Sequence, residues 1–292
     1  MMNFIRLFLI LVFLPFAKAE TKIETVICSF SILKDLCAQL CQGIDTIEVK
    51  TIVENWFDPH MYQPKPSDSK LLAGADLVII NGLNLEGWIN DYIKASGYKG
   101  QIVIASKNVT TRYLGKFPDP HIWHNPELVI KMIDEITHGL KQKFSKYSKK
   151  FESNAISLKS SFNILDQNIK QLFSTIAEGD RIMLTSHDAF SYFGERYNIK
   201  VLSPQGVSTS DDPSAHDMKN LINQIRTLSV SAIFIEKLSN PKILQAIADE
   251  TKIDVQGELY ADTLKEGLNL QDTLWYNATT IAGAMGKKTK DA

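Results

Sequence analysis

The chain has 292 residues, and its 32 basic residues almost balance 33 acidic ones, giving a formal net charge of −1. This balance argues against nucleic acid as a partner, because a surface that binds nucleic acid carries an excess of lysine and arginine. The length suits two domains or lobes of about 100–150 residues each. The three cysteines cannot all pair internally, so we interpret Cys28, Cys37 and Cys41 as buried apolar side chains.

Residues 1–19 have the pattern of a secretory signal peptide. Arg6 supplies the positive region, residues 7–16 form an apolar run, and a small-x-small cleavage site ends at Ala19. The apolar run is too short to cross a bilayer, which needs roughly 20 residues. We therefore expect an exported protein whose mature chain begins at Glu20. No cysteine follows the cleavage site, so a lipid anchor is not expected there.

The first half of the mature chain alternates between strand-like and helix-like segments. The pattern predicts strands over residues 24–28, 47–53, 77–80 and 102–106, and helices over residues 31–41, 67–73 and 85–95, with a further helix from Pro126. We expect Ser31 and Ser67 to cap two of these helices. The run over 77–80 is wholly apolar, as in a strand that is buried on both faces.

A long amphipathic segment follows. Apolar residues recur every three or four positions from Tyr147 to Ile176, and neither proline nor glycine occurs between Phe144 and Ala177. The spacing predicts one uninterrupted helix, roughly 50 Å long at 1.5 Å per residue. A coiled coil is an alternative, but a single segment has no obvious partner. A rigid connector between two lobes fits better.

The alternation then resumes. The second half is predicted to contain strands over residues 182–185, 200–202, 232–236 and 254–258, and helices over residues 189–197, 214–228, 241–251 and 271–285. The fold class is therefore α/β, with two lobes, each a mainly parallel sheet flanked by helices, joined by one long rigid helix. The expected boundaries are 20–143 for the first lobe, 144–178 for the linking helix and 179–292 for the second lobe.

The tripeptide Asp-Pro-His occurs twice, ending at His60 and at His121, each time beside a tryptophan. Proline fixes its own φ and disfavours helix in the preceding residue, so both histidines should lie on ordered loops. Two imidazoles presented from ordered loops suit a metal site. The aspartates, Asp58 and Asp119, are expected either to orient the histidines or to cap the loops.

Two further candidates follow predicted strands in the second half. His187 comes directly after residues 182–186, and Asp262 follows the strand near residues 254–258. Ligands of parallel sheets bind beyond the carboxyl ends of the strands, so these side chains should face a cleft between the lobes. Three imidazoles and a carboxylate form a plausible site for a divalent transition metal. His124 competes with His121 as a ligand, whereas His138 and His216 lie on predicted helices and are interpreted as surface residues.

Several common enzyme motifs are absent from the sequence. It contains no His-Glu-x-x-His, Gly-x-Ser-x-Gly, Walker or Gly-x-Gly-x-x-Gly pattern. A four-ligand site without a spare general base is typical of binding, not catalysis. A secreted metallohydrolase remains an alternative, but it would need an open metal position and a positioned base.

Four ordered motifs resemble one family over nearly all of the mature chain. The segments FDPHMYQPKPSD with ADLVIINGLNLEGW, DPHIWHNP, TSHDAFSYFGERYNI and GELYADTL are similar to those of the periplasmic zinc/manganese solute-binding proteins of ABC transporters, including the treponemal-type members. The resemblance implies two α/β lobes with a metal between them, and it carries ligand roles onto His60, His121, His187 and Asp262.

The same resemblance implies a function. The chain is expected to be a non-enzymatic, monomeric periplasmic receptor that captures Mn²⁺ or Zn²⁺ and delivers it to a membrane permease with a cytoplasmic ATPase. Manganese-selective members often carry Glu where this chain has His187, which favours zinc. The chain lacks the His-rich loop of many zinc-selective members, which favours manganese, and Fe²⁺ stays open as well. A secreted adhesin with a structural metal is the alternative function.

Overall fold

The computed structural model describes residues 22–210, 213–228, 230 and 232–286, so the expected signal peptide lies outside the described residues. The first half contains the strands β1 Glu24–Phe30, β2 Ile47–Val53, β3 Leu77–Ile80 and β4 Gln101–Ile104, and the helices α1 Ser31–Leu40, α2 Pro66–Ala73, α3 Ile89–Ser96 and α4 Pro126–Lys143. The second half contains the strands β7 Ile182–Leu184, β8 Lys200–Leu202, β9 Ala232–Glu236 and β10 Val255–Leu259, and the helices α6 Ser191–Tyr197, α7 Ala215–Leu228, α8 Lys242–Thr251 and α9 Leu270–Met285.

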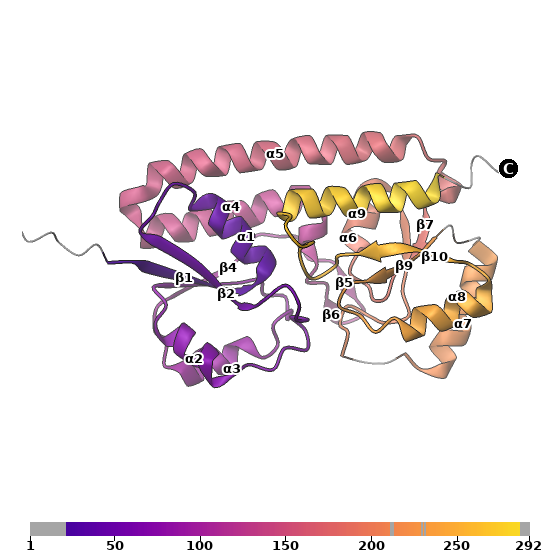
Figure 1. Cartoon of the computed structure of the whole chain (residues 1–292), viewed down its shortest axis with the longest axis horizontal. Coiled ribbons are helices and arrows are strands. Elements are labelled where there is room, and N and C mark those ends of the chain that lie inside the picture. The colour runs from indigo at the N-terminus through magenta and orange to yellow at the C-terminus, as the bar shows by residue number, and fades with distance from the viewer. Residues whose placement is uncertain (1–21, 211–212, 229, 231, 287–292) are drawn as a thin grey trace, which may run out of the picture.

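Each half forms one parallel four-stranded sheet, which confirms the predicted fold class. The strand orders are β2-β1-β3-β4 and β10-β9-β7-β8, and every pairing within them is parallel. All four residues of β3 are buried, as the continuous apolar run predicts. We call each sheet together with its helices a lobe. Helices α2 and α3 flank the sheet of the N-terminal lobe, and α7 and α8 flank the sheet of the C-terminal lobe (Figure 1).

The predicted capping serines are wrong at two helices. Helix α1 begins at Ser31 itself, after Phe30, and α2 begins at Pro66, after Lys65. Proline suits the first position of a helix because its missing N–H would have had no partner there. The Asp68 carboxylate accepts the backbone N–H of Lys65 at 2.6 Å, so an acid inside the first turn satisfies this helix start.

A short hairpin was not predicted. Strands β5 Tyr113–Leu114 and β6 Phe117–Pro118 pair antiparallel across the dipeptide Gly115-Lys116. Gly115 has a φ of +60°, which a two-residue hairpin turn requires at its first central position. Two-residue strands are too short to show alternation, and the Gly-Lys dipeptide was the available signal.

The linking helix is shorter than predicted. Helix α5 covers Ser148–Ser174, 27 residues, and is about 40 Å long at 1.5 Å per residue. It is separated from α4 by Phe144, with φ −121° and ψ 55°, and by a 3-10 turn over Ser145–Tyr147. Apolar periodicity continues through this turn, so the pattern alone could not place the start of the helix.

Helix α5 packs along both lobes. Figure 1 shows it running along the long axis above both sheets, with α9 beside it over the C-terminal lobe. Phe151, Phe162 and Phe173 on its inner face are fully buried in a core that includes residues of both lobes. Each buried phenylalanine contributes about 2 kcal/mol by removal from water. At the start of α9, the Leu270 N–H donates to Asp35 of α1 at 3.0 Å, so the C-terminal helix also contacts the N-terminal lobe.

Candidate metal centre

Four loops place the predicted ligands between the lobes. His60 lies between β2 and α2, and His121 directly precedes the 3-10 turn Ile122–His124. His187 and Asp262 each lie three residues beyond the end of a strand, β7 and β10 respectively. Each lobe supplies two of the four side chains, as the sequence predicts, and in the C-terminal lobe both come from the carboxyl ends of parallel strands.

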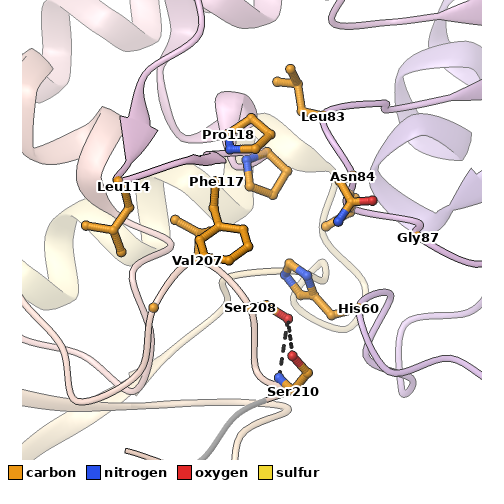
Figure 2. A pocket seen from close by; sticks show the side chains of 14 residues that line it. His60, Leu83, Asn84, Gly87, Leu114, Phe117, Pro118, Val207, Ser208 and Ser210 are labelled. Atoms are coloured by element: carbon orange, nitrogen blue, oxygen red, sulfur yellow. Dashed lines mark hydrogen bonds between the residues drawn. The ribbon is translucent and has the colours of Figure 1, made fainter.

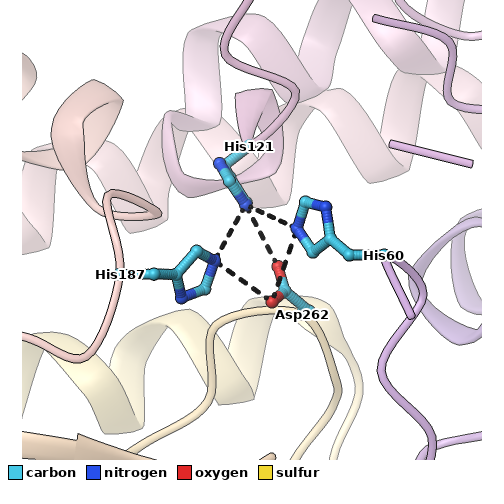
Figure 3. A group of neighbouring side chains, drawn as sticks. All are labelled: His60, His121, His187 and Asp262. Atoms are coloured by element: carbon cyan, nitrogen blue, oxygen red, sulfur yellow. Dashed lines mark hydrogen bonds and ion pairs between the residues drawn. The ribbon is translucent and has the colours of Figure 1, made fainter. Parts of the chain in front are cut away.

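The four side chains converge on one point (Figure 3). Each offers one ligand atom, and these atoms all lie within 4.8 Å of one another. His121 Nε2 is 3.2 Å from the Nε2 atoms of both His60 and His187. The Asp262 carboxylate lies 3.4 Å from Nε2 of His121 and of His187, and 3.9 Å from Nε2 of His60. A tetrahedral site with metal–nitrogen distances of about 2.0–2.1 Å has ligand-to-ligand distances of about 3.3–3.4 Å. The spacing therefore fits a transition-metal ion.

The two Asp-Pro-His motifs share a local turn. In each, the aspartate carboxylate accepts the backbone N–H of the histidine, at 2.8 Å for Asp58 and 3.0 Å for Asp119. Asp119 also accepts from Nδ1 of His121 at 2.7 Å, which leaves Nε2 of that ring free to face the cluster. Asp58 instead accepts the hydroxyl of Thr209 at 2.5 Å and so ties the His60 loop to the C-terminal lobe. Both aspartates therefore cap their loops, and Asp119 also orients the histidine ring, so each of the two roles considered from the sequence occurs.

Glu236, at the end of β9, holds His187. One carboxylate oxygen accepts the backbone N–H groups of Ser186 at 2.9 Å and of His187 at 3.1 Å. The other oxygen accepts a hydrogen bond from Nδ1 of His187. A carboxylate on Nδ1 fixes the imidazole tautomer and directs the lone pair of Nε2 toward the cluster. Sequence analysis did not identify Glu236; an acid that ends an otherwise apolar strand was the signal.

Burial decides the charges in the cluster. It lowers the pKa values of His60 and His121 well below the usual 6.5, and the neighbouring imidazoles lower them further. Burial also disfavours a charge on His187, but Glu236 and Asp262 outweigh it and raise that pKa to about 10. Burial raises the pKa of Asp262 to about 8, although His187 acts in the opposite direction. At neutral pH these pKa values leave both His187 and Asp262 protonated, and a cation bound at these two side chains would displace those protons.

One carboxylate oxygen of the cluster has no hydrogen-bond partner among the described residues. Asp262 Oδ1 is buried and accepts no hydrogen bond. A buried carboxylate oxygen without a donor is unfavourable by itself. A divalent cation in the centre of the cluster would satisfy it, so the donor set fits a metal ion.

The remaining histidines lie elsewhere. His124, the competing candidate, is within hydrogen-bonding distance of the Ala261 carbonyl, 3.0 Å from its Nε2, and its ring lies 4.4 Å from that of Phe190. Its imidazole is thus a core residue outside the cluster. His138 and His216 are exposed on α4 and α7, as predicted.

Arg112 was also missed by sequence analysis. Its guanidinium donates to Asp119 at 2.9 Å and to Glu195 of α6 at 2.9 Å, and it lies 3.8 Å from Asp188. It therefore connects the carboxylate behind His121 to the segment that follows His187. The sequence around Arg112 carries no motif that marks this contact.

Comparison with known proteins agrees with this architecture. The model of the family described as "Zinc-uptake complex component A periplasmic" matches residues 26–284. The manganese-binding lipoprotein MntA of Bacillus subtilis is 30% identical over 254 residues, which cover 82% of this chain and 83% of that protein.

Two solved structures are similar over most of the chain. The periplasmic zinc-binding protein TroA of Treponema pallidum superposes with a TM-score of 0.85 at 25% identity, covering 90% of this chain and 99% of that one. Fe(III)-bound YtgA of Chlamydia trachomatis superposes with a TM-score of 0.82 at 26% identity, covering 90% and 98%. The family match spans nearly all of the described chain, and the chain therefore belongs to the family of periplasmic metal-binding components of ABC-type uptake systems.

Proposed function

We propose that His60, His121, His187 and Asp262 are the ligands of the transported cation. The observation that carries this proposal is the convergence of three Nε2 atoms and one carboxylate, all within 4.8 Å of one another, from four separate loops. Three of these side chains are buried, and His60 has only 3% of its side chain exposed. Such a buried donor set is stable only if something compensates the charge and the lone pairs.

As a family member, the chain is a metal-binding receptor of an ABC importer and not an enzyme. It acts outside the cytoplasmic membrane, in the periplasm or at the cell surface. We propose that it works as a monomer, delivers the cation to a membrane permease with a cytoplasmic ATPase, and binds no nucleic acid. All four donors are occupied as ligands in this proposal, so no general base is left for hydrolysis.

The proposed cargo is Mn²⁺ or Zn²⁺. The printed names of relatives divide between the two, MntA being manganese-binding and TroA zinc-binding, while YtgA holds Fe(III). Three imidazoles favour Zn²⁺ on ligand chemistry alone, because Mn²⁺ stands at the weak end of the affinity series. Several distances between the donor atoms, 3.2–3.4 Å, are close to the edge of a tetrahedral zinc site, which also favours Zn²⁺ over Mn²⁺.

Two further proposals concern export of the chain and its domain boundaries. We propose that residues 1–19 are a cleaved signal peptide; several relatives are named lipoproteins. No helix in the described part of the chain has both the length and the apolar character to span a membrane. We propose lobes over residues 20–143 and 179–292, with the linking segment over 144–178.

Titration of the metal-free chain with both ions tests the proposal. His60→Ala and His187→Ala should each weaken binding of Zn²⁺ and of Mn²⁺ at least about tenfold, since each removes one donor. His138→Ala is the matched control because this histidine is exposed on α4, and it should bind as the parent does. Unchanged stoichiometry and affinity in His187→Ala would remove that residue from the site.

A further inference from the structure

A cavity of about 560 Å³ lies directly beside the metal centre. Its walls come from residues 83–85 and 87, from the β5–β6 hairpin and from residues 206–208 and 210, and His60 forms part of its lining (Figure 2). The cavity therefore lies between the two lobes and shares one side chain with the cation site. Its volume falls within the range of about 300–1,000 Å³ that is usual for small-molecule pockets.

The lining is mainly apolar and lacks formal charge. Leu83, Leu85, Leu114, Phe117 and Val207 contribute hydrocarbon surface, and none of the described lining residues is Asp, Glu, Lys or Arg. A hydrated cation on its own would gain little from such walls. A small number of polar groups, among them the Asn84 amide and the His60 ring, accompanies them, as in pockets for organic ligands.

The cavity adjoins the cation site at His60, whose side chain is 3% exposed, whereas Asp262 lines a separate, small pocket with Asp58 and Glu236. His121 and His187 have no exposed side-chain surface, and Asp262 retains 4%. His60 is the member of the cluster that lines the cavity. Zn²⁺ is satisfied by four ligands, whereas Mn²⁺ prefers six, mainly oxygen, so Mn²⁺ in this cluster would still accept oxygen donors.

One wall of the cavity is held in an unfavourable conformation. Leu83 and Asn84 have φ angles of 54° and 62°, directly after Gly82 at 84°. Asparagine tolerates such an angle, but leucine rarely adopts it, so the strain lies mainly at Leu83. The buried Glu86 carboxylate holds this turn by accepting the N–H groups of Asn81 at 2.8 Å and of Gly82 at 3.2 Å. Backbone strain that the surroundings enforce is typical of segments that clamp ligands.

We propose that this cavity binds the apolar body of a small organic anion whose oxygen donors complete the coordination of the cation at His60. The protein then holds Mn²⁺ in a ternary complex with a chelator such as an aromatic hydroxy-carboxylate. This inference rests on the proposed metal site, but it concerns a second ligand that the four protein donors do not require.

Binding of Mn²⁺ in the presence of salicylate tests the inference, with acetate as an oxygen donor that lacks an apolar body. Salicylate at millimolar concentration should raise the apparent affinity of the metal-free chain for Mn²⁺ about tenfold, the order that burial of one aromatic ring allows after immobilisation costs. Acetate should change it less than about twofold, since it buries little apolar surface. Quenching of salicylate fluorescence by the bound Mn²⁺ reports the ternary complex directly.

Neighbouring hairpin residues provide matched variants. Leu114→Trp fills the cavity, whereas Tyr113→Trp alters an exposed residue of the same strand that does not line it. Leu114→Trp should abolish the salicylate effect while Mn²⁺ binding without salicylate stays as in the parent, and Tyr113→Trp should keep both. Val207→Phe fills the cavity from the opposite lobe and covers the case in which Leu114→Trp disturbs the hairpin.

The outcomes separate this inference from the proposed function. If Mn²⁺ and Zn²⁺ fail to bind without any anion, the metal site itself is wrong. If Mn²⁺ binds but salicylate and acetate act alike, or the salicylate effect survives both filling variants, the cavity is not a chelator site. If the filling variants impair uptake in cells while the parent forms no ternary complex, the cavity receives a group from the permease, and the inference is overturned.

Discussion

Replacing Glu236 with Gln isolates the group that orients His187. Glutamine keeps one oxygen for the backbone N–H groups of Ser186 and His187, which Glu236 accepts at 2.9 and 3.1 Å. Its amide nitrogen, however, replaces the oxygen that faces Nδ1 of His187. An amide N–H there requires Nδ1 to accept, so the imidazole proton moves to Nε2 and occupies the position of the metal bond.

The expected loss follows from this change of tautomer. Removing the partner of a metal-binding histidine typically weakens binding about 10–100-fold, which corresponds to about 1.4–2.8 kcal/mol. The loss should be similar for Zn²⁺ and Mn²⁺, because it acts on the imidazole and not on the ion. The fold should persist, since the backbone hydrogen bonds of the strand end retain an acceptor.

Competition between the metal-free protein and a chromophoric chelator measures the affinity. Glu258→Gln is the matched control: Glu258 lies on the neighbouring strand β10, its side chain is 41% exposed, and its carboxylate contacts Lys237 at 3.4 Å. Thermal unfolding of each metal-free variant checks that the fold is intact. If Glu236→Gln binds Zn²⁺ within about twofold of the parent while His187→Ala does not, the tautomer argument is refuted.

Four further predictions concern metal selectivity, proton release, the stability of the metal-free fold and lobe motion. His187→Glu should shift the Zn²⁺ to Mn²⁺ affinity ratio toward Mn²⁺, since a hard oxygen replaces an imidazole; an unchanged ratio in a two-ion titration would count against it. Zn²⁺ affinity should rise with pH between about 6 and 8, because the pKa of His187 is raised to about 10 and that of Asp262 to about 8, so that binding displaces protons from both groups. Calorimetry in buffers of different ionisation enthalpy counts the released protons, and a count of zero at pH 7 would contradict the assignment. The same raised pKa of His187 stabilises the metal-free fold below about pH 6.5, and this contribution should be lost as pH approaches 10, seen as a falling Tm. Metal removal should leave the radius of gyration in solution scattering nearly unchanged, because α5 and α9 pack across both lobes; a large increase would disprove the rigid connection.

The pH prediction differs from what three unperturbed histidines would give. From the sequence alone, reference pKa values of about 6.5 predict a steep loss of affinity below about pH 6. In the structure, burial lowers the pKa values of His60 and His121 well below 6.5, and neighbouring imidazoles lower them further. His187 lies beside two carboxylates, and its pKa moves the other way. Tertiary neighbours, which periodicity and motifs do not contain, decide the sign at each ring.

Residues close in sequence were the easier part of the site. The Asp-Pro-His repeat identified His60 and His121 because the proline and the aspartate act within two residues of the imidazole. Glu236 and Arg112 were missed because their partners, His187 and Asp119 among them, come from other elements. Strand β3 was predicted well because its signal is also local: a strand buried on both faces is a continuous apolar run, here of four residues.

Release of the cation is the step that this architecture makes difficult. Each lobe supplies two of the proposed ligands, so wide separation of the lobes would break the site. The core shared by both lobes along α5 opposes that motion. A loop must therefore move instead. The loop of His60 is the best placed, since His60 lines the cavity, and its Asp58 is bound to the C-terminal lobe through one exchangeable hydrogen bond from Thr209. His121 and His187, in contrast, are each held through Nδ1 by a buried carboxylate. From this asymmetry we expect that cation release begins with withdrawal of His60, which leaves the other three proposed ligands in place.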